Sequence, residues 1–248
     1  YEKIKIRGDK EKLIQIRETH RGPIISDIHT LTKKSNNVFS FSWVGNEYWN
    51  EIESFINLNK MTNWNDFSDA VSGMSSPAQN IIYADVDGNI GWRAVGKIPI
   101  RDGGNFLLPL PGETSKYDWK GYIPFDEMPY EFNPDRGYII TANNKTISND
   151  YNHYVSSLWH NSSRYDRIFE LINDRNNLNQ NDMKIIQNDL ISPFARKLSK
   201  KIIVPFKNYN YSDDNIEYSI ELLKNWDGNF KTDSKEPLIF SVILMKIL

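Results

Sequence analysis

The sequence contains no cysteine, so disulfide bonds and thiolate metal sites are excluded. It also lacks a long hydrophobic run: the longest, LIFSVIL at residues 238–244, is far shorter than the ~20 residues that span a bilayer. Its formal net charge is only −2, so it has no basic field that would attract nucleic acid or an anionic membrane. We therefore expect neither nucleic acid nor a membrane span among its interactions.

Short catalytic signatures are absent as well. The chain has no GxSxG, no P-loop, no HExxH and no GxGxxG. DVDGN at residues 85–89 suggests a calcium loop, but the twelfth position, which needs an acid, is Gly96, so a hairpin turn is the better interpretation. The four histidines show no metal-ligand spacing. Local motifs alone therefore assign no function.

The composition that remains, 39% hydrophobic and 25% charged residues, is typical of a globular protein. Alternating apolar residues predict strands in the first part, with Ile4 and Ile6 on one face. Asp-Gly-Asn at 87–89 tolerates positive φ and predicts a tight hairpin. We expect a strand at 38–45 and one antiparallel sheet system built from strands at 2–7, 12–17, 79–86, 89–96 and 137–142.

Helical patterns appear at 47–61 and 63–72, the second capped by Thr62 or Asn63. Residues 97–136 form a loop rich in proline, glycine and aromatic residues. After residue 160 the chain is helical, with starts predicted at Ser162 or Ser163, at Asn179, at Ser192 before Pro193, and at Ser212 in a helix ending at Gly228. The prediction is an α+β fold: a strand-rich segment over 1–160 and a helical segment over 161–248, in one incomplete domain.

Both ends of the chain suggest that it was cut from a longer protein. The first residue is Tyr1 rather than methionine, and the last eleven residues, LIFSVILMKIL, carry no helix stop signal. A fragment of this kind is expected to expose an apolar face where its missing strands would lie.

Longer patterns are more specific than the short ones. QNIIYADVDGNIGWRAVGKIPIR, LLPLPG, YDWKGYIPFDEMP, NPDRGYIITANN and LWHNSSRYDRIFELI follow one another in this order between residues 79 and 172. Together they resemble the penicillin acylase (penicillin amidase) family of N-terminal nucleophile hydrolases, and the resemblance extends from about Thr19 to the end. It implies part of an αββα sandwich.

The resemblance also implies a reaction. Such enzymes are precursors that cleave themselves into two chains, and the serine that begins the second chain attacks a linear amide, with its own α-amine as base. The substrate would be a small acylated amine, such as a β-lactam or an acyl-homoserine lactone. Because this chain begins with tyrosine, we expect an internal piece of the second chain, inactive alone. Its partners would be the alpha chain and the rest of the beta chain, in a parent enzyme outside the cytoplasm.

Three residues match functional positions of the family. Asn143, which the sequence alone suggests to be a strand-end amide, matches the donor to the oxyanion of the tetrahedral intermediate. Arg164 matches the arginine that orients the nucleophile region, with Arg167 as a competing alignment. Gln79 matches a position that lines the acyl pocket and is apolar where aromatic acyl groups are preferred. An amide there argues against a phenylacetyl substrate, unless Gln79 points elsewhere.

Many family members bind a structural calcium ion, which leaves calcium open for the full-length parent. Its aspartate ligand in the segment before Trp159 has no clear counterpart here, because His153 falls near that position and Asp150 requires a shift in the alignment. We therefore predict no metal or other cofactor for this chain.

Two other classes of function compete with the enzyme. The first is a non-catalytic, aromatic-rich ligand-binding module, suggested by the 13% aromatic content and the loop at 105–133. It predicts exposed rings, whereas the family predicts that Trp119, Tyr122 and Phe125 are packed. The second is a scaffold without a ligand, in which Asn143 and Arg164 would lie far apart or in salt bridges.

Overall fold

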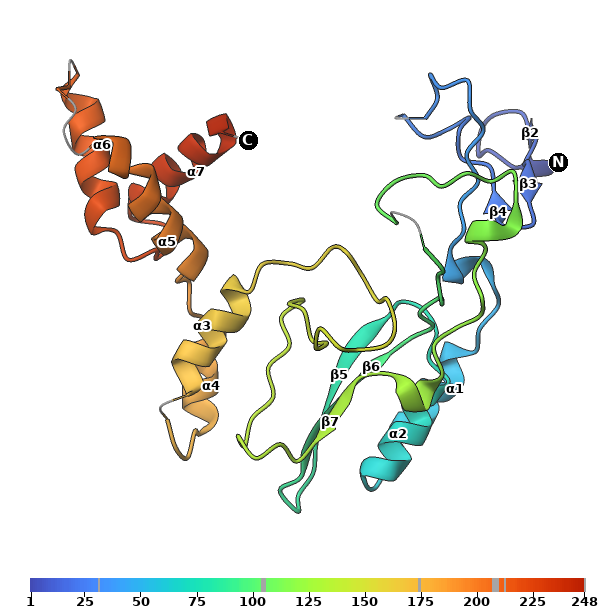
Figure 1. Ribbon diagram of the computed structural model, residues 1–248, viewed down its shortest axis with the longest axis horizontal. Helices are drawn as coiled ribbons and strands as arrows, with labels where there is room; N and C mark the ends of the chain where they lie inside the picture. The colour runs from blue at the N-terminus through green and yellow to red at the C-terminus, as the bar shows by residue number, and fades with distance from the viewer. Residues whose placement is uncertain (31, 104–105, 174, 207–209, 212, 248) are drawn as a thin grey trace. The chain divides into compact units, whose positions relative to one another are not determined.

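The computed structural model describes residues 1–30, 32–103, 106–173, 175–206, 210–211 and 213–247 (Figure 1). The chain divides into two compact units. The first unit comprises Tyr1–Ile139 and Ile147–Leu158, and the second comprises Ile140–Thr146 and Trp159–Leu248. The stretch 140–146 therefore belongs with the helices, although it precedes residue 160 in the sequence.

The first unit contains the strands, and all of its pairings are antiparallel. They form three separate sheets instead of the one sheet system that we predicted. The sheets are β1 (Glu2–Ile4) with β2 (Lys12–Ile14), β3 (Glu18–Thr19) with β4 (Gly22–Pro23), and β5 (Gln79–Ala84), β6 (Ile90–Val95) and β7 (Tyr130–Phe132) in that order.

The predicted hairpin at 79–96 is confirmed as β5 and β6. Its turn is closed by Asp85, whose Oδ1 accepts hydrogen bonds from the backbone N–H groups of Asp87 and Asn89 at 3.0 and 2.9 Å. Gly88 adopts φ +87°, a conformation that glycine reaches without steric cost. The DVDGN stretch is thus a turn held by a carboxylate.

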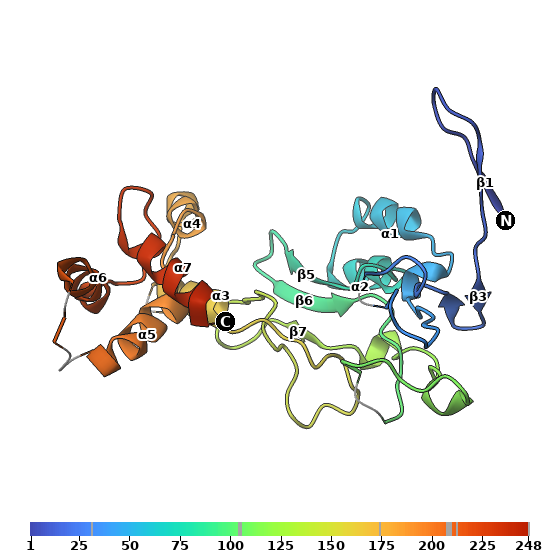
Figure 2. The same cartoon turned by 90° about the horizontal axis from the view of Figure 1, so that it is seen from above.

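Two helices, α1 (Glu51–Leu58) and α2 (Trp64–Ser72), lie on one side of the β5–β6–β7 sheet (Figure 2). Asn63 starts α2, because its side chain accepts hydrogen bonds from the N–H groups of Asn65 and Asp66. The helix then directs Phe67 and Val71 toward Tyr83 of the sheet. The core of the first unit consists of Phe67, Val71, Met74, Tyr83 and Val95.

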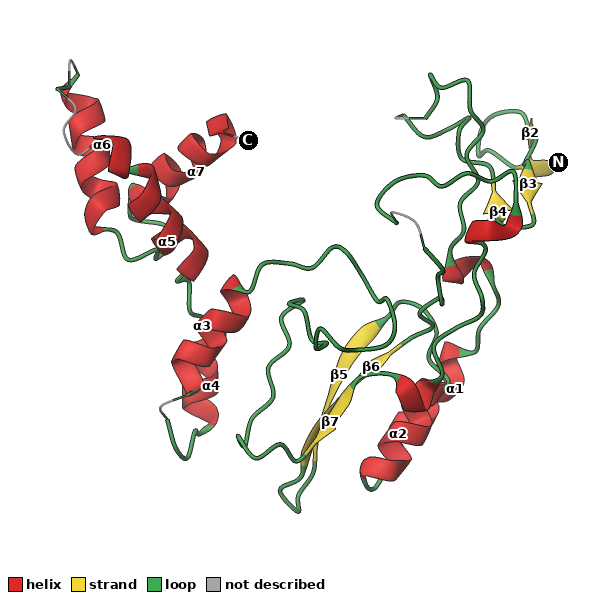
Figure 3. Cartoon of the chain, viewed as in Figure 1, coloured by secondary structure: helices red, strands yellow, loops and turns green. Residues whose placement is uncertain are grey.

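Figure 3 shows that the described part of the second unit is helical and without strands. Asn179 and Asp182 form a capping box at the start of α4, and Ser192 caps α5 before Pro193, as the sequence predicted. Leu223 and Trp226 lie in its core with Phe240. The helices of the second unit are α3 (Ser163–Ile172), α4 (Gln180–Gln187), α5 (Pro193–Ile202), α6 (Asp214–Asn225) and α7 (Glu236–Ile247), with a short 3-10 helix at Val204–Phe206. The first unit contains 3-10 helices at Val44–Asn46, Ser115–Tyr117 and Phe125–Glu127.

Two predicted strands are wrong. Residues 38–45 contain an isolated bridge between Ser40 and Ile24, and the stretch ends in the 3-10 helix Val44–Asn46. The carbonyl of Phe41 is occupied by the side chain of Asn46, which ends the pairing there. Residues 137–142 are not a strand either, since a strand requires a hydrogen-bonded neighbour, and this stretch is divided between the first unit, to Ile139, and the helical unit, from Ile140.

Several predicted boundaries shift. The strands predicted at 2–7 and 12–17 shorten to three residues each, and the helix predicted at 47–61 begins four residues later, at Glu51. Ser212, the predicted start of a helix, lies outside the described residues. The cap of α6 is Asp213, and the helix ends at Asn225, before Gly228.

Large apolar side chains are exposed at many places along the described chain, including one element of each unit. In the first unit they line the β1–β2 hairpin, where Leu13 is 62% exposed. In the second unit they line α7, where Leu238 and Met245 are 69% and 70% exposed. Among the described helices, none is long and apolar enough to cross a bilayer.

We expect Phe67→Ala to destabilise the first unit by roughly 3–5 kcal/mol, because it empties a core position between α2 and the sheet. Phe67 is only 1% exposed and contacts the rings of Trp64 and Tyr83. Urea denaturation measures the loss. Phe55→Ala on α1 is the matched control, since that ring is 53% exposed and its removal should change stability by about 0.5 kcal/mol at most. Equal losses for the two variants would contradict this account of the core.

Candidate active site

The candidate site begins with the turn at Ala142–Asn144 in the second unit. Ala142 is buried, and Asn143 adopts φ +59° with an exposed side chain. Asparagine is one of the few residues other than glycine that tolerate this left-handed conformation. Asn144 stabilises the turn, because its Oδ1 accepts from the N–H of Ala142 at 3.0 Å and its Nδ2 donates to the carbonyl of Lys145.

Two contacts attach this turn to α3 and to the segment before it. The N–H of His160 donates to the carbonyl of Asn143 at 3.1 Å. Arg164, in the first turn of α3, donates from Nη2 to the carbonyl of Ala142 at 2.9 Å and to Oδ1 of Asn143 at 2.7 Å. The structure therefore brings together two of the three residues selected from the sequence.

The contact with Arg164 fixes the orientation of the Asn143 amide. A guanidinium carries only hydrogen-bond donors, so it must face the amide oxygen. The Nδ2 group then points the other way, and no acceptor for it lies among the residues that the structure describes. Asn143 thus presents an uncharged N–H donor whose direction is set by a cation.

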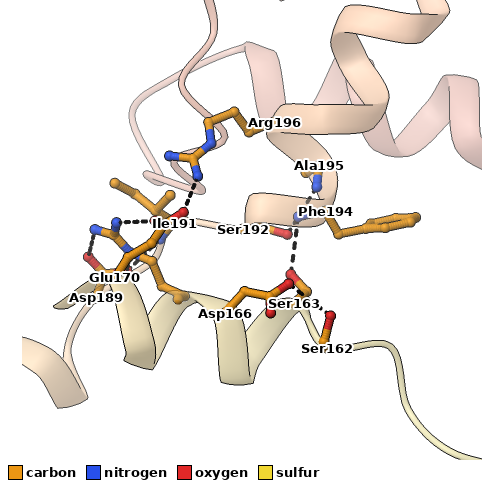
Figure 4. Close-up of polar contacts among 11 residues, drawn as sticks. Ser162, Ser163, Asp166, Glu170, Asp189, Ile191, Ser192, Phe194, Ala195 and Arg196 are labelled. Carbon is orange, nitrogen blue, oxygen red and sulfur yellow. Dashed lines mark hydrogen bonds and ion pairs between the residues drawn. The ribbon is translucent and has the colours of Figure 1, made fainter. Parts of the chain in front are cut away.

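Arg167, the competing candidate, serves a different purpose. It donates from Nε and Nη2 to the two carboxylate oxygens of Asp189 at 2.8 and 2.7 Å, and from Nη1 to Glu170. Arg196 of α5 pairs with the other oxygen of Glu170 at 2.5 Å, so these ion pairs fasten α3 to the segment before α5 and to α5 itself (Figure 4). Arg167 is committed to this network, and Arg164 is the arginine beside Asn143.

The network changes the titration of its carboxylates. Hydrogen bonds from Arg167 hold the pKa of Asp189 below its usual value, although partial burial opposes them. Partial burial likewise opposes the shift at Glu170, but the hydrogen bonds from Arg167 and Arg196 lower its pKa. Both carboxylates are therefore charged at neutral pH and act in structure rather than in proton transfer.

A groove of about 490 Å³ lies between α3 and α5. Figure 4 shows Asp166 and Glu170 on its α3 side and Phe194 and Arg196 on its α5 side. The N–H of Phe194 donates to Oγ of Ser163 at 3.1 Å, which joins the starts of the two helices. Neither Asn143 nor Arg164 lines this groove, so it is distinct from the candidate site.

A family model described as penicillin amidase matches residues 1–248. The chain belongs to the penicillin amidase family. It is 31% identical over 202 residues to the acyl-homoserine lactone acylase QuiP of Pseudomonas fluorescens, covering 81% of this chain and 24% of that protein. It is 29% identical over 229 residues to the penicillin G acylase of Escherichia coli, covering 89% and 26% respectively. The chain thus spans about a quarter of the length of these relatives.

A solved structure supports the fold of this penicillin amidase family chain. A thermostable penicillin G acylase from Alcaligenes faecalis superposes with a TM-score of 0.71 at 23% identity, over 94% of this chain and 41% of that one. The predicted α+β class and the N-terminal nucleophile hydrolase fold are confirmed.

Gln79, the third residue selected from the sequence, lies in the first unit. It is the first residue of β5, opposite Val95, and its side chain is exposed. No other described residue forms a hydrogen bond with the side-chain amide of Gln79. The sequence did not identify Ala142 and His160, whose backbone groups complete the Asn143 turn. The only signal for them is that they lie within the NPDRGYIITANN and LWHN motifs.

The positions considered for the family's calcium ion do not form a metal site here. His153 places Nε2 2.5 Å from the carboxylate of Glu127, and Asp150 is hydrogen-bonded by Ser148, which lowers its pKa. Among the described residues, no group of three or more histidine, aspartate or glutamate side chains is placed to hold a metal.

Trp119, Tyr122 and Phe125 are half-buried and contact neighbouring side chains, in line with the packing that the family predicts, whereas Tyr130 of the same loop is 53% exposed. Trp119 meets Tyr122 edge-on at 6.1 Å, and Tyr122 meets Trp49 in the same way. Phe125 lies 4.0 Å from the guanidinium of the buried Arg93. Of these three rings, Phe125 packs against the core of the first unit.

We expect acid to weaken the second unit partly through Asp189. Because its pKa is lowered in the folded state, Asp189 stabilises the fold above its unfolded pKa of about 4, and this stabilisation is lost as the pH falls through the folded pKa. Asp189→Asn should cost roughly 1–3 kcal/mol at pH 7, and its loss of stability between pH 5 and 2 should be smaller than that of the parent chain.

Urea denaturation at a series of pH values provides the measurement. Asp233→Asn is the control, because Asp233 is exposed and forms no ion pair with another described residue. If the free energy of unfolding falls with pH in the same way for the Asp189 variant and the unmodified protein, the Arg167–Asp189 pair contributes nothing to the acid sensitivity.

Proposed function

We propose that the protein carrying this chain is an amidohydrolase that cleaves the linear amide of an acylated small molecule, with Asn143 as an oxyanion donor. The observation that carries the proposal is the contact from Arg164 Nη2 to Asn143 Oδ1 at 2.7 Å. It leaves Nδ2 of Asn143 as a preorganised donor. Family membership supplies the type of reaction, and this contact supplies a chemical role for a residue of this chain.

The proposed reaction begins with a serine at the start of a processed chain, outside these 248 residues. Its Oγ attacks the amide carbonyl while its proton passes to the terminal α-amine. The carbonyl oxygen becomes negative, and Nδ2 of Asn143 donates a hydrogen bond to it. The C–N bond then breaks, the amine leaves with a proton, and water hydrolyses the acyl-enzyme to release the acid.

Arg164 is proposed to position Asn143 rather than to bind the oxyanion itself. Its Nη2 group is bonded to Ala142 and Asn143 in the structure, so the cation lies behind the amide. Because the donor is already fixed in position, the protein has to rearrange little when charge develops on the substrate. The cation also polarises the amide oxygen, which makes the opposite N–H a better donor.

The acyl group is proposed to meet Gln79. The relatives include an acyl-homoserine lactone acylase and the penicillin acylase 2 proenzyme of Pseudomonas sp., 28% identical over 204 residues, and both names describe removal of an acyl group. The exposed amide of Gln79 favours an acyl chain with a polar atom over an unsubstituted phenyl ring. The substrate partner is thus a small acylated amine, and the catalytic partner is the chain that bears the nucleophile.

We expect Asn143→Ala, made in the full-length enzyme, to lower the rate constant for acylation roughly 10²–10³-fold with little change in substrate affinity. The donor acts where charge develops, so its loss affects the transition state most. Asn143→Asp should be at least as harmful, because a carboxylate repels the oxyanion. Single-turnover kinetics separates acylation from binding.

Asn177→Ala is the matched control for these variants. Asn177 has the same φ of +59° and an exposed side chain, so its replacement carries the same backbone strain without touching the site. It should acylate at the unmodified rate. If Asn143→Ala weakens affinity alone and leaves acylation intact, Asn143 is a binding residue and not an oxyanion donor.

We also expect Gln79→Leu to raise kcat/KM for a phenylacetylated amine by about tenfold relative to a hydroxyacylated amine, since burying an apolar side chain is worth about 1–3 kcal/mol. Competition between the two substrates measures the ratio directly. Gln187→Leu, at the exposed end of α4, is the control and should leave the ratio unchanged. An unchanged ratio for Gln79→Leu would remove this residue from the acyl pocket.

A further inference from the structure

Arg101, in the first unit, is surrounded by aromatic rings. Its guanidinium carbon lies 5.6 Å from the ring centre of Phe106, 5.8 Å from that of Trp119 and 6.0 Å from that of Tyr154. The rings of Phe106 and Tyr154 also contact each other, with centres 4.7 Å apart. We call Arg101 with these three rings the Arg101 box. Rings at this distance attract a cation and keep water away from it.

The hydrogen bonds of Arg101 are poor for a half-buried cation. A guanidinium has five N–H donors, but within the described chain Arg101 donates only from Nη1 to the carbonyl of Pro99, at 3.4 Å. This distance is long compared with the usual ~2.9 Å. No carboxylate of the described residues forms an ion pair with it. Burial lowers the pKa of Arg101, so its surroundings by themselves do not compensate its charge.

The other well-packed arginines differ from Arg101. Arg21 donates to a carboxylate of Asp118 and to two backbone carbonyls, and Arg167 binds two carboxylates. Arg93 is the closest comparison, since it lies against the rings of Phe125 and Tyr130 and also lacks a carboxylate. It nevertheless donates to Ser68 Oγ and to the carbonyl of Phe125. Arg101 combines the absence of a carboxylate partner with a single long hydrogen bond among the described residues.

We propose that the Arg101 box binds a carboxylate group, supplied by a small organic acid or by an acidic side chain elsewhere in the full-length protein. The guanidinium fork matches a carboxylate with two parallel hydrogen bonds. Phe106, Trp119 and Tyr154 add an apolar wall for the body of the acid. Because all four side chains are half-buried, an anion can reach the fork, and the rings strengthen its attraction by excluding water. This binding goes beyond the amide cleavage proposed above and does not depend on it.

Calorimetric titration of the full-length protein with benzoate, at constant ionic strength against chloride, tests for a free acid. Benzoate carries a planar carboxylate on a ring that suits the box. We expect Arg101→Met to bind benzoate at least tenfold more weakly than the unmodified protein. Arg101→Lys keeps the charge but not the fork, so it should fold normally and still bind more weakly. Arg7→Met, which removes an exposed arginine, should leave binding unchanged.

A carboxylate supplied by the protein itself gives a different result. Benzoate would then not bind, but the loss of stability in Arg101→Met would be large at pH 7. It would shrink as the pH falls below about 4, because the partner carboxylate becomes protonated in both proteins. Thermal denaturation between pH 7 and 3 measures this difference. The titratable group that faces Arg101 among the described residues is Tyr154.

The proposal is overturned if benzoate binds equally to the unmodified protein and Arg101→Lys, or if no benzoate binds and the effect of Arg101→Met on stability is independent of pH. In the second case Arg101 would serve only to pack the three rings.

Discussion

The candidate site depends on a single bifurcated contact, in which Nη2 of Arg164 holds the carbonyl of Ala142 and Oδ1 of Asn143. The carbonyl contact fixes the backbone of the turn, and the amide contact fixes the direction of the donor. Because Arg164 lies in the first turn of α3, any element that positions α3 also positions the donor. The site is therefore as rigid as the helical unit that carries it.

The second unit supplies that rigidity through charge and through capping. Arg167 and Arg196 pair with Asp189 and Glu170, which join α3 to α5 and the segment before it. Ser163 accepts from the N–H of Phe194, and this bond links the starts of the two helices. Partly buried, bidentate pairs of this kind hold geometry better than exposed ones, since less solvent competes for the charges. The two arginines of α3 thus have different roles: Arg167 joins α3 to its neighbours, and Arg164 orients the Asn143 amide.

Arginine is also the residue around which the first unit is arranged. Arg21 fastens the β3–β4 turn to the long loop, Arg93 lies buried between two rings, and Arg101 lies among three. In the described part of the long loop, aromatic side chains and backbone carbonyls contact these cations. This explains how forty residues rich in proline and glycine can belong to a packed structure.

The sequence by itself determined the local features. Asn63, Asn179 and Ser192 start helices because each side chain satisfies N–H groups within its own first turn, and Asp85 closes the hairpin in the same way. The ordered motifs between residues 79 and 172 were sufficient to identify the family, and they pointed to Asn143 and Arg164 as a pair. Information of this kind lies within a few neighbouring residues or in motif order.

Only the tertiary structure decided which partner each group would find. The stretch 137–142 has the apolar pattern of a strand, but a strand needs hydrogen-bonded neighbours, and this stretch instead turns toward α3. The sequence favoured Arg164 over Arg167 only through motif spacing, because both lie near the start of one helix and are separated by less than one turn. The choice depends on the carboxylate of Asp189 and the amide of Asn143, each more than twenty residues away along the chain, which folding places beside one arginine and not the other.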